Sequence, residues 1–159
     1  MKQKLTPELA YPKARHYCAY SERCHADVRD KLYSLWLIRK DVELLLSRLI
    51  EEDCLNEERY AIQFAGGHFR QKKWGKTKII NALRQKKVSE RNIRKALLEI
   101  EEPDYRQTLE KLAITKWRSL KGEQWISRQA KTTAYLLQKG FEAKIVQTVV
   151  QKIRTENTE

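Results

Sequence analysis

The sequence predicts an all-α fold of three tandem three-helix repeats. The main observation is a series of apolar residues, separated by steps of 5, 5, 3, 1 and 3 positions, that occurs three times at offsets of 51 and 53 residues. Such a period indicates a tandem array in which neighbouring units support one another's small cores. The eighteen positions are Leu32, Leu37, Val42, Leu45, Leu46 and Leu49, then Leu83, Val88, Ile93, Ala96, Leu97 and Ile100, and finally Leu136, Phe141, Val146, Val149, Val150 and Ile153.

Two further observations exclude β-structure. No stretch alternates apolar and polar residues between turn signals, and the β-branched residues recur at helical spacing. With only five glycines and three prolines, weak breakers divide the chain into nine helical stretches.

The first repeat covers residues 5–55. Thr6 is a suitable N-cap, Pro7 suits the first helical position, and a helix is expected to about Ser21. A second helix is expected over residues 24–35 and a third over 39–53, with its apolar residues on one face.

The second repeat covers residues 56–101. Asn56 is expected to cap its first helix, and the Trp74–Gly75 step to end that helix. A second helix then carries Leu83, and Ser89 caps a third helix that runs to about Glu101.

The third repeat covers residues 103–155. Pro103 opens its first helix, and Lys121–Gly122 separates that helix from a second one over residues 126–139. Gly140 is well placed to end the second helix in a left-handed conformation, and the last helix should run from Phe141 to about Arg154.

Three tryptophans outside the basic segment are expected to pack. Trp117 aligns with Phe64 of the second repeat and is expected in the core. Trp36 and Trp125 lie near helix ends, and packing is favoured for both over a role as exposed anchors.

Cysteine and histidine do not indicate a metal site. His16, Cys18, Cys24 and His25 are close in sequence, but a structural zinc site needs paired ligands two to four residues apart. Adjacent residues of a helix point about 100° apart, so core or half-buried thiols are the better interpretation. Three cysteines without a CxxC pair favour a reduced, cytosolic compartment.

The sequence contains no recognisable catalytic or cofactor motif. It has neither G-x-S-x-G nor the phosphate-binding G-x-x-x-x-G-K-[ST], and its acidic pairs lie near helix ends. We therefore expect a protein that is not an enzyme and needs no cofactor. No apolar run is long enough to span a membrane, and the N-terminus lacks the apolar stretch of a signal peptide.

The positive charge is concentrated in the middle of the chain. The formal net charge is +12, of which residues 56–100 carry +8, residues 5–55 carry −1 and residues 101–159 carry +3. Eight basic residues and no acidic one occur between residues 70 and 87. Because like charges this dense repel one another, the segment favours a polyanionic partner over a merely solvated face.

The candidate binding residues come from this segment. Trp74 lies inside it and has two open interpretations, stacking on a nucleic-acid base or packing against its own helices. The full set is Arg70, Lys72, Lys73, Trp74, Lys76, Lys78, Arg84, Lys86 and Lys87.

The repeat order, the basic middle unit and several short motifs resemble the RecX family of bacterial recombinase regulators. The matching motifs include Ala14-x-x-Tyr17-Cys18-x-x-Ser21 and Val28-x-x-Lys31-Leu32 in the first repeat. The second repeat contributes Glu58-Arg59-Tyr60-Ala61-x-x-Phe64, Gly75-Lys76-x-Lys78-Ile79 and Leu83-Arg84-Gln85-Lys86, and the third contributes Leu136-Leu137-Gln138-Lys139-Gly140-Phe141. One departure is that the glycine after Lys139 has no counterpart in the other repeats, where Trp36 and Lys87 stand.

The resemblance implies an elongated, curved, monomeric array in the cytoplasm. Its partners would be the RecA recombinase, mostly as a filament on DNA, and single- or double-stranded DNA itself. Its effect would be to inhibit the ATP hydrolysis and strand exchange that RecA performs. It would act in DNA repair, recombination and the SOS response. Two alternatives remain open. One is a stand-alone nucleic-acid-binding protein, and the other is a helical scaffold whose charge only aids solubility.

Overall fold

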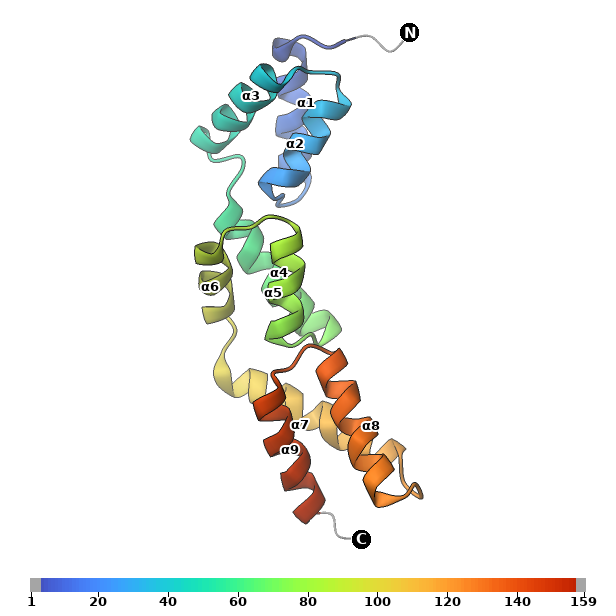
Figure 1. The fold of residues 1–159 in the computed structure, drawn as a ribbon. Coiled ribbons are helices and arrows are strands. Elements are labelled where there is room, and N and C mark those ends of the chain that lie inside the picture. Colours follow the sequence, from blue (N-terminus) through green and yellow to red (C-terminus); the bar gives the residue numbers. More distant parts are fainter. Residues whose placement is uncertain (1–3, 157–159) are drawn as a thin grey trace. The chain divides into compact units, whose positions relative to one another are not determined.

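The computed structural model describes residues 4–156 and confirms the all-α prediction, since this range contains nine helices and no strand (Figure 1). None of these helices combines the length and the apolarity that a membrane span requires. In chain order they are α1 (Pro7–Tyr20), α2 (His25–Ser34), α3 (Arg39–Glu51), α4 (Glu57–Lys72), α5 (Lys76–Gln85), α6 (Glu90–Leu98), α7 (Glu102–Ser119), α8 (Trp125–Gln138) and α9 (Ala143–Glu156).

The chain forms two compact units. The first unit comprises the chain up to Phe64 together with Leu83–Ala96, and the second comprises Ala65–Ala82 together with the chain from Leu97 onward. The division passes through α4, α5 and α6, so the residues of the middle repeat are shared between the units.

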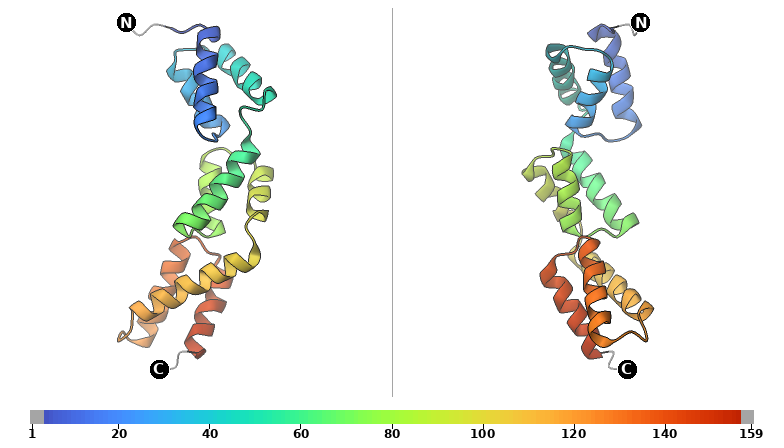
Figure 2. Two further views of the ribbon diagram at one scale, coloured as in Figure 1. Left: turned by 180° about the vertical axis from the view of Figure 1, so that it is seen from behind. Right: turned by 45° about the vertical axis from the view of Figure 1, so that its right-hand side comes forward.

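Each unit has a core built on three helices that pack pairwise. In the first unit α1, α2 and α3 bury Val28, Leu32 and Leu49 completely. In the second unit α7, α8 and α9 pack against one another (Figure 2), and Tyr105 and Trp117 of α7 are buried. Aromatic rings therefore fill much of the second core, whereas aliphatic side chains dominate the first.

The repeated apolar positions are core positions. Seventeen of the eighteen side chains are buried, and the exception, Leu97, is half-buried. The repeat register predicted from the sequence is therefore confirmed at the level of burial.

The predicted caps form. The Thr6 hydroxyl accepts a hydrogen bond from the Leu9 N–H at 3.3 Å, Asn56 Oδ1 accepts from the Arg59 N–H at 2.9 Å, and the Ser89 hydroxyl accepts from the Asn92 N–H at 3.2 Å. These bonds satisfy N–H groups that have no acceptor within their own helix.

Some helix ends differ from the prediction by two or three residues, among them the end of α3 at Glu51 instead of residue 53. Helix α6 ends at Leu98 rather than near Glu101, because the Ile100 N–H bonds to the Leu97 carbonyl in a turn that buries Ile100. Helix α9 begins at Ala143 rather than Phe141, because Phe141 belongs to the preceding turn and donates its N–H to the Leu136 carbonyl.

One left-handed turn recurs in all three repeats. Trp36, Lys87 and Gly140 follow the second helix of their repeats and have φ values of 64°, 60° and 98°. Each N–H donates to the carbonyl three residues earlier at 3.0 Å. Trp36 and Lys87 therefore replace the glycine of the third repeat while keeping the same left-handed backbone conformation.

The tryptophan predictions have mixed outcomes. Trp117 is buried as predicted, with 1% of its surface exposed. The prediction for Trp36 is wrong, since this side chain is 56% exposed, because its neighbours Leu35 and Leu37 occupy the core side of the turn. Trp125 is 37% exposed, yet its ring packs edge-on against Trp117 with the ring centroids 5.3 Å apart.

Candidate polyanion-binding surface

The predicted basic residues fall into two groups. Arg70 and Lys72 end α4, Lys73 and Trp74 form the loop, and α5 begins with Lys76 and Lys78, all in the second unit. A separate group, Arg84, Lys86 and Lys87, lies at the end of α5 in the first unit.

Three of these side chains are paired with carboxylates. Arg84 Nε lies 2.7 Å from Glu90, Lys86 Nζ lies 3.1 Å from Asp27, and Lys76 Nζ lies 3.3 Å from Glu102. The hydrogen bond to Asp27 raises the pKa of Lys86. Hydrogen bonds from Arg106 and Lys76 lower the pKa of Glu102. These charges are partly balanced within the fold, which reduces their availability to an outside anion.

The other predicted cations have no salt bridge within the described chain, residues 4–156; they are Arg70, Lys72, Lys73, Lys78 and Lys87. Lys72 Nζ and Lys78 Nζ lie 5.5 and 4.7 Å from the centroid of the Trp74 ring. His68 packs against the same ring, with the centroids 4.5 Å apart. Trp74 thus packs against its own helices and holds two lysines beside it by cation–π attraction.

Backbone hydrogen bonds fix the end of the loop that contains Lys73 and Trp74, where α5 begins. The Gly75 N–H donates to the Lys139 carbonyl at 2.8 Å, and the Thr77 N–H donates to the Gly140 carbonyl at 2.9 Å. Between them, the Lys76 N–H donates to the Tyr105 hydroxyl at 2.9 Å, which itself donates to Glu142. These bonds tie the start of α5, which carries Lys76 and Lys78, to the α8–α9 turn and to α7.

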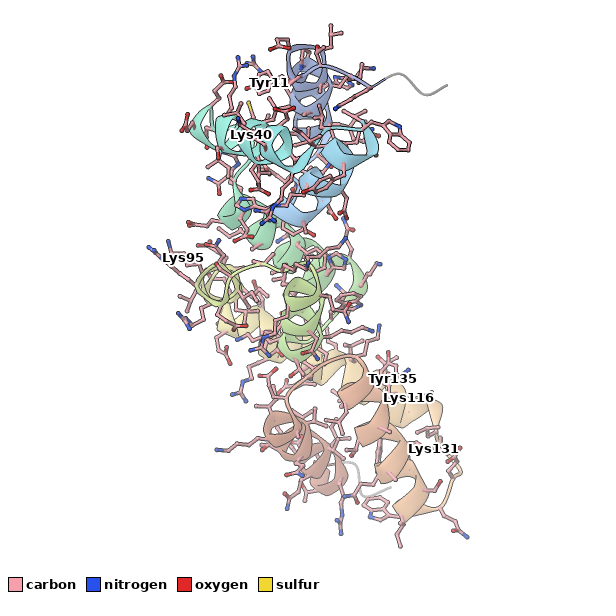
Figure 3. All side chains as sticks on the ribbon, turned by 45° about the horizontal axis from the view of Figure 1, so that its top comes forward. Tyr11, Lys40, Lys95, Lys116, Lys131 and Tyr135 are labelled. Carbon is pink, nitrogen blue, oxygen red and sulfur yellow. The ribbon has the colours of Figure 1, made fainter. Side chains whose placement is uncertain are left out.

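The structure brings together a further set of basic residues that the local charge density of the sequence did not reveal. Lys111 and Lys116 on α7 line a pocket of about 380 Å³ together with Lys73 and with Tyr135 of α8. Lys116 Nζ lies 5.1 Å from the centroid of the Tyr135 ring, and Figure 3 labels both residues. The other lining residues are Thr108, Leu112, Thr115 and Ser119.

This pocket suits a phosphate group. Three lysines and three residues with aliphatic hydroxyls line it, and no acidic residue is among its lining residues in the described chain. The signal in the sequence is helical spacing, because residues 108, 111, 112, 115 and 119 recur at steps of three and four along one face of α7.

The described histidines, cysteines and acidic residues do not gather into a metal site. Within residues 4–156 no group of three or more His, Cys, Asp or Glu side chains is placed to hold a metal ion. Cys18 and Cys24 are buried, as predicted, and Cys54 is half-buried. Cys24 Sγ also accepts the Asp27 N–H at 3.4 Å and caps α2.

Comparison with known proteins identifies the family. Residues 56–97 match the model of the second three-helix domain of RecX, and residues 104–150 match that of the third. This chain belongs to the RecX family. The resemblance inferred from the short motifs is thereby confirmed.

Curated relatives are named regulatory protein RecX. The protein of Oceanobacillus iheyensis is 26% identical over 160 residues, which cover 100% of this chain and 59% of that protein. The protein of Limosilactobacillus reuteri is 24% identical over a match that covers 91% of this chain and 54% of that protein. The protein of Chlorobium limicola is 29% identical over a match that covers 70% of this chain and 69% of that protein. The chain thus spans little more than half the length of the first two relatives.

Two crystal structures of RecX share the fold. The RecX of Lactobacillus salivarius has a TM-score of 0.85 at 23% identity and covers 94% of this chain and 97% of its own. A second RecX structure has a TM-score of 0.82 at 24% identity, with 90% and 70% covered. The name of the curated relatives describes them as regulatory proteins.

Proposed function

We propose that this protein modulates the RecA recombinase by binding RecA or the RecA–DNA filament and suppressing ATP hydrolysis and strand exchange. The name of the curated relatives supports a regulatory role. The observation that carries the proposal is the set of unbalanced lysines in the second unit, around Trp74 and in the pocket of Lys73, Lys111 and Lys116.

A recombinase filament suits such a surface because it contains nucleic acid, whose phosphates attract lysine and release counterions on binding. Inhibition then needs no chemistry from the regulator. A protein that binds one filament state more tightly than another shifts the population toward that state. We propose that the regulator acts in this way, as a monomer in the cytoplasm, during DNA repair, recombination and the SOS response.

The alternative is a stand-alone DNA- or RNA-binding helical protein. The same lysines favour it, because their attraction for phosphate does not require RecA. A helical scaffold with charge only for solubility is disfavoured by the pocket, where lysines converge with hydroxyls on one site.

The test is the single-stranded-DNA-dependent ATPase activity of the host's RecA, titrated with this protein. We expect hydrolysis to fall at stoichiometric or lower amounts, and the protein alone to hydrolyse no nucleotide. A variant with Lys73, Lys111 and Lys116 all changed to Gln should inhibit less. An unchanged RecA rate, with DNA binding intact, would select the stand-alone binder.

A further inference from the structure

The near-neutral first repeat contains a second basic groove. This groove, between α1 and α2 in the first unit, has a volume of about 520 Å³. Lys13, Tyr17 and Tyr20 line it from α1, and Arg23 from the connecting loop. Lys31 lines it from α2, beside Leu35.

Tyr17 is the fixed floor of this groove. It packs against the core of the first unit, as Leu35 does. The Arg23 guanidinium carbon lies 3.9 Å from the centroid of the Tyr17 ring, and Arg23 Nε donates to the Tyr17 carbonyl at 3.2 Å. Lys31 Nζ lies 5.5 Å from the same centroid. Two cations are therefore held at one half-buried aromatic side chain.

Tyr20 is the exposed part of the same surface. Its side chain is 81% exposed, and the Arg23 guanidinium carbon lies 6.0 Å from its ring centroid. An aromatic ring so exposed contributes little to the fold. A π-face beside fixed cations is the arrangement on which nucleic-acid bases stack.

The charge of the groove is local and unbalanced. Lys13, Arg23 and Lys31 form no salt bridge with any described residue, and no acidic side chain lines the groove. The net charge of −1 over residues 5–55 hides this concentration, because the acidic residues of the repeat lie elsewhere, for example in the Arg29–Glu43 and Arg48–Glu52 pairs.

We propose that this groove binds single-stranded nucleic acid, with a base stacked on Tyr20 and backbone phosphates held by Lys13, Arg23 and Lys31. Bases in a duplex are already stacked, so only a single strand offers a free base to the ring. An acidic protein segment would satisfy the cations and leave the Tyr20 ring without a partner. The inference concerns direct binding and does not rest on RecA regulation.

The test uses the full chain without RecA. An ¹⁵N-labelled sample is titrated with an oligothymidylate of about 12 nucleotides and, separately, with a duplex of equal length. Amide shifts in α1 and α2 should saturate with the single strand only. Ultraviolet cross-linking to 5-iododeoxyuridine should place the adduct on Tyr20. Because it uses the unaltered protein, cross-linking tests the proposal even if a variant folds poorly.

Substitution gives the second readout. Tyr20→Ala should weaken binding of the single strand roughly 10-fold, as expected for the loss of one base stack, and should leave duplex affinity within about 2-fold. Tyr20→Phe keeps the ring and should bind as the unaltered protein does. Shifts and adducts confined to the second unit would overturn the proposal, as would a Tyr20-dependent interaction with a glutamate decamer but not with DNA. Because RecA is absent, neither result depends on the ATPase test.

Discussion

Gly75 and Gly140 lie backbone against backbone, so closely that a β-carbon at position 75 would fall 2.2 Å from the carbonyl carbon of Gly140. The contact brings the Gly75 N–H within 2.8 Å of the Lys139 carbonyl. Only glycine allows this approach, because any side chain would push the start of α5 away from the α8–α9 turn.

Gly75→Ala should therefore destabilise the protein by about 2–4 kcal/mol, through overpacking and the loss of backbone hydrogen bonds. Urea unfolding measures the effect. Gly67→Ala is the matched control, since a β-carbon at position 67, inside α4, has open space around it. That change should stabilise the protein by about 0.5–1 kcal/mol. Equal effects of the two substitutions would contradict the close approach.

Lys87→Gly should stabilise the protein by about 1 kcal/mol, because Lys87 has a φ of 60° and a left-handed backbone costs an ordinary residue about that much. The measurement is again the free energy of unfolding in urea. Lys87→Ala removes the same charge without relieving the strain and should give no such gain. A stabilisation equal in both variants would assign the effect to charge.

Leu83→Ala should lower the free energy of unfolding by about 2–5 kcal/mol, because Leu83 is completely buried at a repeated core position. Leu98→Ala is the control on α6, where the side chain is 82% exposed, and should change stability by less than about 0.5 kcal/mol. A small loss at Leu83 would remove the physical basis of the repeat register.

The dependence of DNA binding on salt should flatten when Lys73, Lys111 and Lys116 are changed to Gln, because each phosphate contact contributes about 0.9 to the slope. Fluorescence anisotropy at several salt concentrations measures it. The control changes Arg29, Arg84 and Lys131 to Gln; these three residues are paired with Glu43, Glu90 and Glu123. Equal flattening in both variants would mean that net charge, rather than the pocket, drives binding.

Cys54 should be alkylated by iodoacetamide at pH 8 well before the other two thiols. Burial raises the pKa of Cys18 to about 11 and also raises the pKa of Cys24, so both remain largely thiols. The same shifts mean that stability falls as pH rises above 9, where the unfolded thiols ionise first. Mass spectrometry of the alkylated protein checks the order; early modification of Cys18 would show that the first core opens readily.

The sequence predicted the features that local chemistry determines. Thr6, Asn56 and Ser89 are caps because their side chains bond to the nearest free N–H groups, which requires no knowledge of the tertiary fold. The apolar spacing likewise predicted burial, because helical periodicity places those residues on one face.

Features that depend on residues far apart in the chain could not be predicted from the sequence. The pairing of Lys76 with Glu102 and of Lys86 with Asp27 reduces two charges that looked available. Lys111 and Lys116 were missed because charge density favours clusters along the chain, whereas their pocket draws on α7 and α8. Trp36 was misjudged because its exposure depends on which neighbours occupy the core.

The bonds at the start of α5 also bear on how the chain matures on the ribosome. The Gly75, Lys76 and Thr77 N–H groups find their acceptors on Lys139, Tyr105 and Gly140, which are synthesised some time later. Until residue 140 has left the exit tunnel, the Gly75 and Thr77 N–H groups lack these acceptors and bond to water instead. The start of α5 should therefore reach its final order only after residue 140 has emerged, and a nascent chain stalled before that point would present a frayed α5.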